Sequence, residues 1–336
     1  MRKYLLPKEG KFYKANLHMH TIISDGRMTL EETKKEYLKR GYSIVAFTDH
    51  EVLVPHNDLS DDNFLAITST EISLNISYER EFIYNKCYHL NLYSRDPNKS
   101  FYSVFSKKRI WLEQSRKYIT EEQEKIDFSR TYSVYDVNYM IKKAKEEGFL
   151  VSYNHPVWSL QNYNDYSELK GLWGVEWWNT GCVNMGYIDT IQPIDDLLRK
   201  GENVFPLATD DAHKIEDCFG GWINVKSIDL TYDSVFNALE KGDFYSSSGP
   251  EIYDLFIEDG IINILCSEVD KIYVSSERRY NNIIIGTDIT HAKLDINEYI
   301  NKSKDNKNDN QYIRLTLIDK NGKIAYTRGY KLNELI

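Results

Sequence analysis

The sequence predicts an α/β protein in which a parallel, barrel-type sheet is followed by a small antiparallel β-sandwich. Three observations predict this fold. Short apolar runs alternate with amphipathic helical segments up to about residue 209, as expected for βαβ units. A histidine or a carboxylate lies at the end of most of these runs. Beyond residue 250, short alternating runs separated by turn residues replace this pattern, so we expect two domains, 1–250 and 251–336.

The first part of the chain begins with the alternating segment 15–21, in which His18 and His20 share one face of an expected strand. Residues 28–40 predict a helix with Thr29 as its N-cap. The other expected strands are 43–47, 64–72, 87–93, 149–153, 173–178 and 204–209. The other expected helices are 100–124, 133–147 and 188–199. In a parallel barrel, residues that follow the strands meet at one rim.

Residues 251–336 show almost no helical periodicity. Their strand-like runs are separated by glycines and by the pair Asn321-Gly322, a strong signal for a hairpin turn. We expect this part to be the antiparallel β-sandwich, with the polar run 301–311 as a solvated loop within it.

The composition limits the class of protein. A net charge of -9 disfavours long nucleic acid as the main partner, because neutralising phosphates needs a basic face. No run approaches the ~18 apolar residues of a membrane span, and residues 1–7 lack the apolar stretch of a signal peptide. The four scattered cysteines are typical of reduced thiols. We expect a soluble, cytoplasmic protein with no membrane partner, and its oligomeric state stays open.

Ionisable side chains gather at the ends of the expected strands, and six of the eight histidines are among them. Mixed histidine and carboxylate donors favour Zn, Mn or Fe over Ca. Nine donors exceed the needs of one tetrahedral ion, so we expect two or three divalent metal ions at this rim. The candidate ligands are His18, His20, Asp25, His50, Glu71, His89, His155, Asp211 and His213.

These residues resemble the motifs of the PHP (polymerase and histidinol phosphatase) superfamily over residues 12–250. The resemblance is carried by Leu17-His18-Met19-His20-Thr21, Ser24-Asp25-Gly26, Thr48-Asp49-His50, Glu71, His89, Asn154-His155-Pro156 and Asp211-Ala212-His213. It implies a distorted (β/α)7 TIM-like barrel, called the PHP domain, with a trinuclear metal site and phosphoesterase activity. The Ser248-Gly249-Pro250 junction and the following sandwich resemble the stand-alone, carbaryl-hydrolase-like branch.

The resemblance also implies how the ligands divide among three metals. The implied sets are His18, His20, Glu71 and Asp211; Glu71, His89 and His155; and Asp25, His50 and His213. Glu71 would then bridge two ions. We expect Glu71, Asp211 and His213 to be the catalytic residues.

Three further carboxylates, Asp49, Glu176 and Asp210, lie near the same expected rim. Two interpretations of them stay open: they orient ligand imidazoles, or they are ordinary solvated loop carboxylates. Arg27 and Lys214 stand beside expected ligands and are candidates for a phosphate contact, although surface charge is the favoured interpretation.

These features predict a metal-dependent hydrolase. We expect a phosphoesterase that cleaves a small phosphorylated metabolite or short nucleotide by attack of a metal-bridging hydroxide, so that the partner is a small anionic substrate. Hydrolysis of a carboxyl ester, amide or carbamate on the same site stays an alternative, because hydroxide attacks carbonyl and phosphoryl centres alike. The alternative from another class is a non-catalytic metal- or carbohydrate-binding module, which the complete ligand set disfavours.

Overall fold

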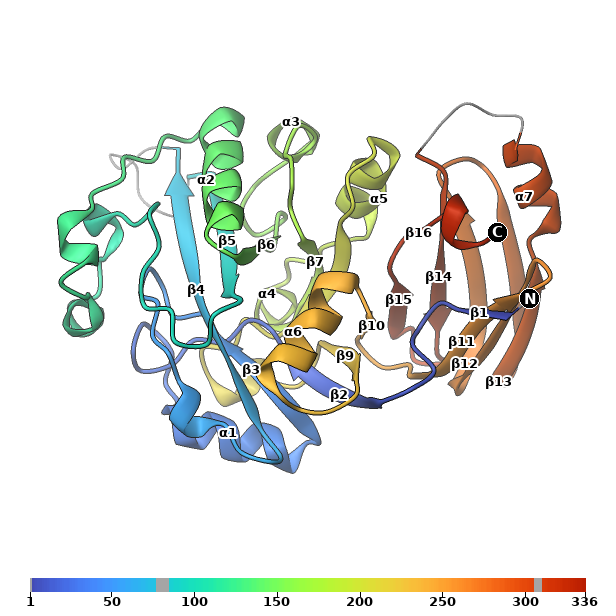
Figure 1. Ribbon diagram of the computed structural model, residues 1–336, viewed down its shortest axis with the longest axis horizontal. Helices are drawn as coiled ribbons and strands as arrows, with labels where there is room; N and C mark the ends of the chain where they lie inside the picture. The colour runs from blue at the N-terminus through green and yellow to red at the C-terminus, as the bar shows by residue number, and fades with distance from the viewer. Residues whose placement is uncertain (1, 77–84, 305–309) are drawn as a thin grey trace.

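The computed structural model describes residues 2–76, 85–304 and 310–336 and shows a mixed α/β protein with one large sheet of sixteen strands (Figure 1). The strands are β1 (Arg2–Tyr4), β2 (Lys11–Asn16), β3 (Tyr42–Phe47), β4 (Leu65–Asn75), β5 (Cys87–Ser94), β6 (Phe149–Tyr153), β7 (Gly174–Asn179), β8 (Phe205–Thr209), β9 (Trp222–Ser227), β10 (Phe244–Ser247), β11 (Ile252–Glu258), β12 (Ile261–Ser276), β13 (Asn281–Asp295), β14 (Tyr312–Ile318), β15 (Ile324–Thr327) and β16 (Tyr330–Lys331).

Seven α-helices accompany this sheet within the described residues. They are α1 (Leu30–Lys39), α2 (Val134–Glu146), α3 (Tyr163–Tyr166), α4 (Thr180–Asn184), α5 (Gln192–Arg199), α6 (Tyr232–Lys241) and α7 (Asn297–Lys304). The helices α1, α2 and α5 confirm three sequence predictions. Thr29 caps α1 as expected and forms a capping box with Glu32, and Ser133 caps α2. None of the helices in the described ranges is long and apolar enough to cross a membrane.

The expected helix over residues 100–124 is wrong. This stretch instead contains three short 3-10 helices, η3 (Lys107–Arg109), η4 (Glu113–Tyr118) and η5 (Gln123–Lys125). Tertiary contacts hold it in this form: Arg130 donates two hydrogen bonds to the carbonyl of Val104, and Ser115 Oγ donates to the carbonyl of Ile23. Such contacts override the weak preference of a segment for helix.

The strands β2 to β8 curve into one continuous surface. β2, β3 and β4 are parallel to one another, as are β6, β7 and β8. The segments that follow β2 and β8 meet, because Met19 forms an isolated parallel bridge with Ala212 and the Asp211 amide donates to the carbonyl of His18 at 2.9 Å. The first and last strands of this part of the sheet, β2 and β8, are therefore joined through the segments that follow them.

Strand β5 corrects the expectation of a purely parallel sheet, since it runs antiparallel to both β4 and β6. This direction brings the amino-terminal part of β5, with His89, to the rim where β3 and β6 end. The strand that carries the first motif is also shorter than expected: β2 ends at Asn16, and His18 and His20 lie in the segment beyond it.

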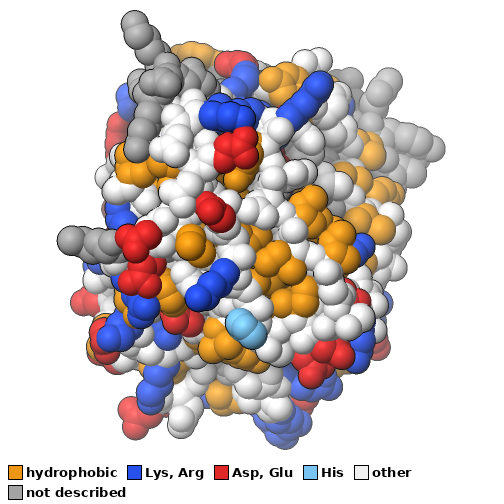
Figure 2. All heavy atoms as spheres, turned by 90° about the vertical axis from the view of Figure 1, so that its right-hand side faces the viewer, with side chains coloured by type: hydrophobic (Ala, Val, Ile, Leu, Met, Phe, Trp, Pro, Cys, Tyr) orange, Lys and Arg blue, Asp and Glu red, His pale blue; other side chains and the backbone are white. Residues whose placement is uncertain are grey.

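The C-terminal strands β11 to β16 are antiparallel and enclose a second apolar core that includes Ile252, Leu255, Ile264 and Leu315. Helix α7 was not expected here. It covers the start of the predicted loop 301–311, of which residues 305–309 lie outside the described ranges. The outer face carries exposed apolar side chains on β11 to β13, and Figure 2 shows hydrophobic groups gathered at its centre among charged ones.

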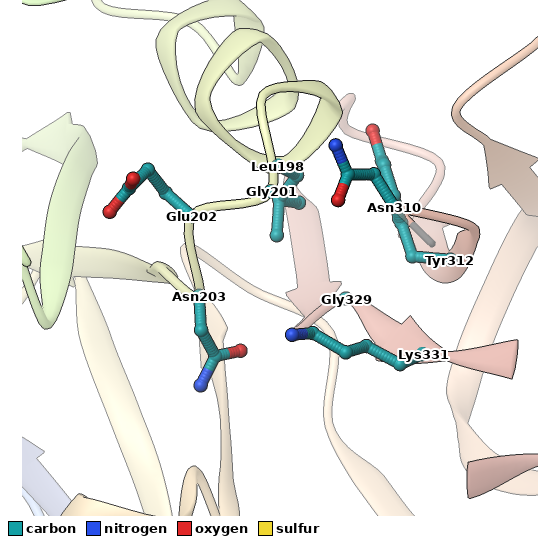
Figure 3. A pocket seen from close by; sticks show the side chains of 8 residues that line it. All are labelled: Leu198, Gly201, Glu202, Asn203, Asn310, Tyr312, Gly329 and Lys331. Atoms are coloured by element: carbon teal, nitrogen blue, oxygen red, sulfur yellow. The ribbon is translucent and has the colours of Figure 1, made fainter. Parts of the chain in front are cut away.

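The sheet continues across residue 250. β10 pairs with β15, and β1 pairs with β11, so strands from both parts of the chain interleave. Arg314 on β14 forms a two-pronged ion pair with Asp195 on α5. A cavity of about 10 Å³, room for one water molecule, lies between residues 198–203 and residues 310–331 (Figure 3). The division into two domains at residue 250, with a sandwich as the second, stays a prediction.

Candidate metal centre

The nine predicted ligands lie together at one end of the curved sheet. Their ligand atoms form four groups, within each of which all the atoms lie within 4.8 Å of one another. The groups are His20, Asp25, His50 and His213; His18, His155 and Asp211; His18, His20 and Glu71; and Glu71, His89 and His155. Every predicted ligand belongs to at least one group. How the ligands divide among individual ions stays a prediction.

Backbone pairing places these donors side by side. The bridge between Met19 and Ala212 aligns the His18–His20 segment with Asp211, and a second parallel bridge joins His50 to Glu71. Asp211 has φ 48° and His155 has φ 28°, values that residues other than glycine seldom adopt. Such strain persists where the surroundings fix the backbone, as at functional sites.

Glu71 lies at the centre of the cluster, and five imidazoles surround its carboxylate. The nearest ring nitrogens lie 3.1–3.4 Å from its oxygens and belong to His18, His20, His50, His89 and His155. Burial raises the pKa of the Glu71 carboxyl, but His89 and His18 outweigh burial and hold this pKa well below its usual range. Glu71 is therefore an anion that faces two of the donor groups at once.

Asp211 shows that the donor atoms suit a cation. Its Oδ1 is buried and accepts no hydrogen bond of normal geometry from any described residue, although the Nε2 atoms of His18 and His20 lie 3.2 and 3.1 Å away. Those two Nε2 atoms are themselves only 3.2 Å apart. Buried polar atoms are normally paired, and a divalent ion would pair all three of these atoms at once.

The protonation of the histidines is consistent with this fit. Burial lowers the pKa of His18, but the carboxylates of Asp211 and Glu71 outweigh burial and raise it well above the usual value. Carboxylates that favour an imidazolium favour a metal cation in the same place. Burial and His20 lower the pKa of His50 to about 3, so this ring is neutral at physiological pH and able to coordinate.

Glu176, Asp49 and Asp210 are all buried, so the solvated interpretation of these carboxylates is wrong. Glu176 Oε1 lies 2.7 Å from His18 Nδ1, and Glu176 also accepts from Thr209 Oγ1 and the His155 amide. This contact keeps a proton on His18 Nδ1 and turns Nε2 toward the donor cluster.

Asp49 and Asp210 hold loops rather than imidazoles. Asp49 accepts hydrogen bonds from the backbone and hydroxyl groups of both Thr21 and Ser24, in the loop between His20 and Asp25. Asp210 accepts from the Tyr37 hydroxyl and from the amides of residues 219–221. Asp49 thereby fixes the loop between two predicted ligands, and Asp210 attaches residues 219–221 to the segment that carries Asp211.

Three asparagines also support the centre, and their roles were not predicted from the sequence. Asn154 donates to Glu71 Oε1 at 2.9 Å, and Asn179 bridges Glu176 and Asp211 at 3.0 and 3.1 Å. Asn16 binds the backbone of His18 through both its amide atoms. Each asparagine lies at or just after the end of a strand. This position was the signal in the sequence that could have indicated a role near the ligands.

The cluster opens to solvent on one side. The side chains of His213 and Asp25 are 36% and 25% exposed, whereas those of His18 and Glu71 are almost fully buried. Arg27 and Lys214 lie in the loops on this side and are exposed, in agreement with the interpretation as surface charge.

The Glu176 contact gives a testable expectation. Glu176→Gln replaces one carboxylate oxygen, which accepts hydrogen bonds from two donors, with an NH2 group that cannot accept them. We therefore expect metal affinity to fall by about 10–100-fold, as when other partners of metal-bound histidines are lost. A competition titration against a chromogenic chelator measures this change. The matched control is Glu202→Gln, a glutamate outside the donor groups. Equal affinity in both variants and the wild type would show that Glu176 does not support the centre.

No family model matches the sequence, and no curated protein matches it. Among solved structures, a two-domain protein from Bacteroides vulgatus, described as containing a predicted PHP-like metal-dependent phosphoesterase, is 13% identical with a TM-score of 0.45; the match covers 98% of both chains. An amidohydrolase from Chromobacterium violaceum is 12% identical (TM-score 0.40), over 68% of this chain and 96% of that one. A lesion-specific endonuclease from Pyrococcus furiosus is 15% identical (TM-score 0.39), over 68% and 56%.

At such identities and TM-scores, these similarities add nothing on function. The description of the first structure names the superfamily that the motifs of this sequence resemble, but at a TM-score of 0.45 that match carries no argument about this chain. The weight of that resemblance rests on the nine ligands and their geometry. The carbaryl-hydrolase-like branch stays a prediction.

Proposed function

We propose that this chain is a metal-dependent hydrolase of the PHP type, and specifically a phosphoesterase for a small phosphorylated metabolite or short nucleotide. The observation that supports the proposal is the convergence of nine donors, with Glu71 shared between two groups. The proposal includes a distorted (β/α)7 barrel for the curved sheet, two or three ions of Zn, Mn or Fe, and a cytoplasmic location.

The residues of the chain account for such a reaction in stages. Divalent ions held by these donors would supply Lewis acidity and would lower the pKa of water, so that a nucleophile would be available at neutral pH. Glu71 and Asp211 place negative charge between the histidines and so fix the spacing of the donor groups. Asp25 and His213 lie on the solvent side, where a substrate arrives. The Asp211 carbonyl, 3.0 Å from His213 Nδ1, keeps a proton on that atom and leaves Nε2 facing Asp25.

A panel of chromogenic esters tests the proposal. We expect the protein loaded with Mn or Zn to hydrolyse p-nitrophenyl phosphate or bis-p-nitrophenyl phosphate, and p-nitrophenyl acetate at least about tenfold more slowly; EDTA should remove the activity. Hydrolysis of the acetate alone would favour the carboxyl-ester alternative. Stoichiometric metal without turnover of any ester would contradict a hydrolase and favour a binding module.

A further inference from the structure

We propose that Trp111 stacks against the organic part of the substrate, and that the substrate therefore carries a planar aromatic group next to its scissile bond. This inference rests on the proposed hydrolase function and narrows its substrate class. Trp111 belongs to the stretch between η3 and η4, outside the nine ligands.

Trp111 lies beside the open side of the metal centre. Its ring centroid is 6.2 Å from that of His50, with an angle of 52° between the planes. His50 Nδ1 is in turn 3.2 Å from Glu71 Oε2. Trp111 is nevertheless 65% exposed, which is rare for the largest apolar side chain. An exposed indole next to a buried polar cluster lies where a bound ligand would contact it.

The segment that carries Trp111 is fixed before any ligand arrives. Ile110 is buried in the main apolar core. Gln114 Nε2 donates to the Ser24 carbonyl at 2.6 Å, and Ser115 Oγ donates to the Ile23 carbonyl at 2.7 Å. These bonds attach the segment to the loop that holds Asp25. A stacking surface held in place costs little ordering entropy when a substrate binds.

A second indole also contacts donor histidines of the cluster. Trp158 is half-buried, with its ring centroid 5.0 Å from that of His155 and 5.5 Å from that of His89. His50 and His89 are themselves 5.8 Å apart. One indole therefore lies against each of these two donor histidines, Trp111 against His50 and Trp158 against His89.

Exposed aliphatic side chains extend the same rim. Three of them each follow a donor histidine by two residues, and all are more than 40% exposed; they are Ile22 after His20, Val157 after His155 and Ile215 after His213. A highly hydroxylated, strongly hydrated leaving group gains little from such surroundings, whereas a flat apolar ring buries its faces there.

The test compares one aromatic and one aliphatic monoester in the metal-loaded full chain. Stacking contributes about tenfold in affinity per aromatic ring. We therefore expect Trp111→Ala to raise the KM for 1-naphthyl phosphate about tenfold and to leave the KM for ethyl phosphate within about twofold. Trp111→Phe should recover most of the loss. Tyr135→Ala removes an aromatic side chain on α2 that is even more exposed than Trp111, and it should change neither constant.

Binding without turnover separates this inference from the proposed function. Calorimetry with phenylphosphonate and methylphosphonate should give a preference for the phenyl ligand in the wild type that Trp111→Ala loses. If no phosphate ester is hydrolysed but this preference appears, the phosphoesterase proposal fails and the stacking surface stands. Equal affinity of wild type and Trp111→Ala for phenylphosphonate, or equal losses for both ligands, would overturn the role of Trp111.

Discussion

Glu71→Gln should leave the protein folded but short of at least one bound metal ion, with a loss of kcat/KM greater than about 100-fold. The loss of residues that only support a metal ligand already costs about 10–100-fold, and Glu71 belongs to two donor groups at once. Gln keeps the shape of the side chain and its contact with Asn154, but it removes the negative charge that five imidazoles surround. Neutralising that charge weakens the attraction of the site for every neighbouring cation.

Metal content and the free energy of unfolding are measured on the same samples, so that loss of metal is distinguished from loss of the fold. Inductively coupled plasma mass spectrometry should find two or three equivalents in the wild type and fewer in Glu71→Gln. The matched control is Glu240→Gln on α6, outside the four donor groups, which should match the wild type in metal and activity. Full metal content together with full activity in Glu71→Gln would rule out Glu71 as the shared ligand.

The second large effect concerns stability rather than catalysis. Arg314→Met should lower the free energy of unfolding by about 3–5 kcal/mol, because removing one partner of a buried ion pair leaves a buried charge without compensation. Arg314 Nε and Nη2 each donate to one oxygen of Asp195 at 2.7 Å. After the substitution the Tyr312 hydroxyl, at 3.2 Å, is the remaining described donor to that carboxylate.

Urea unfolding of matched variants measures this difference. In the double variant Asp195→Leu with Arg314→Met, apolar side chains replace both charges, and we expect most of the lost stability to return. Lys142→Met breaks the exposed Lys142–Glu146 pair on α2 and should cost less than about 1 kcal/mol. If Arg314→Met costs no more than Lys142→Met, the Asp195 pair does not hold the C-terminal strands against α5.

The donor set could be predicted because it depends on local pattern. Histidine or carboxylate at the end of an apolar run is visible in the sequence, and parallel strands bring such ends together. The position of His89 at the same rim has a different cause, since β5 is antiparallel. The expected strands 64–72 and 87–93 leave residues 73–86 between them, which is long enough for a parallel crossover, so the direction of β5 could not be predicted.

Other features depend on contacts that pattern does not reveal. The 3-10 turns between residues 107 and 125 exist because Arg130, Ser115 and Gln114 bind distant carbonyls. Helix α7 is short, and its apolar residues Tyr299 and Ile300 are buried by packing against the C-terminal core, a contact that the local sequence does not reveal. The roles of Asn154 and Asn179 depend on which carboxylates the fold brings near them, and that information is three-dimensional.

The pairing of β1 with β11 has a consequence for how the chain folds. Arg2 on β1 binds Glu258 on β11, a separation of 256 residues along the chain. During synthesis β1 must wait until β11 has left the ribosome, and until then Leu5 and Leu6 lack the core that later buries them. Contacts so distant in sequence form slowly, so β1 is synthesised long before β11 and is among the last strands to reach its native place.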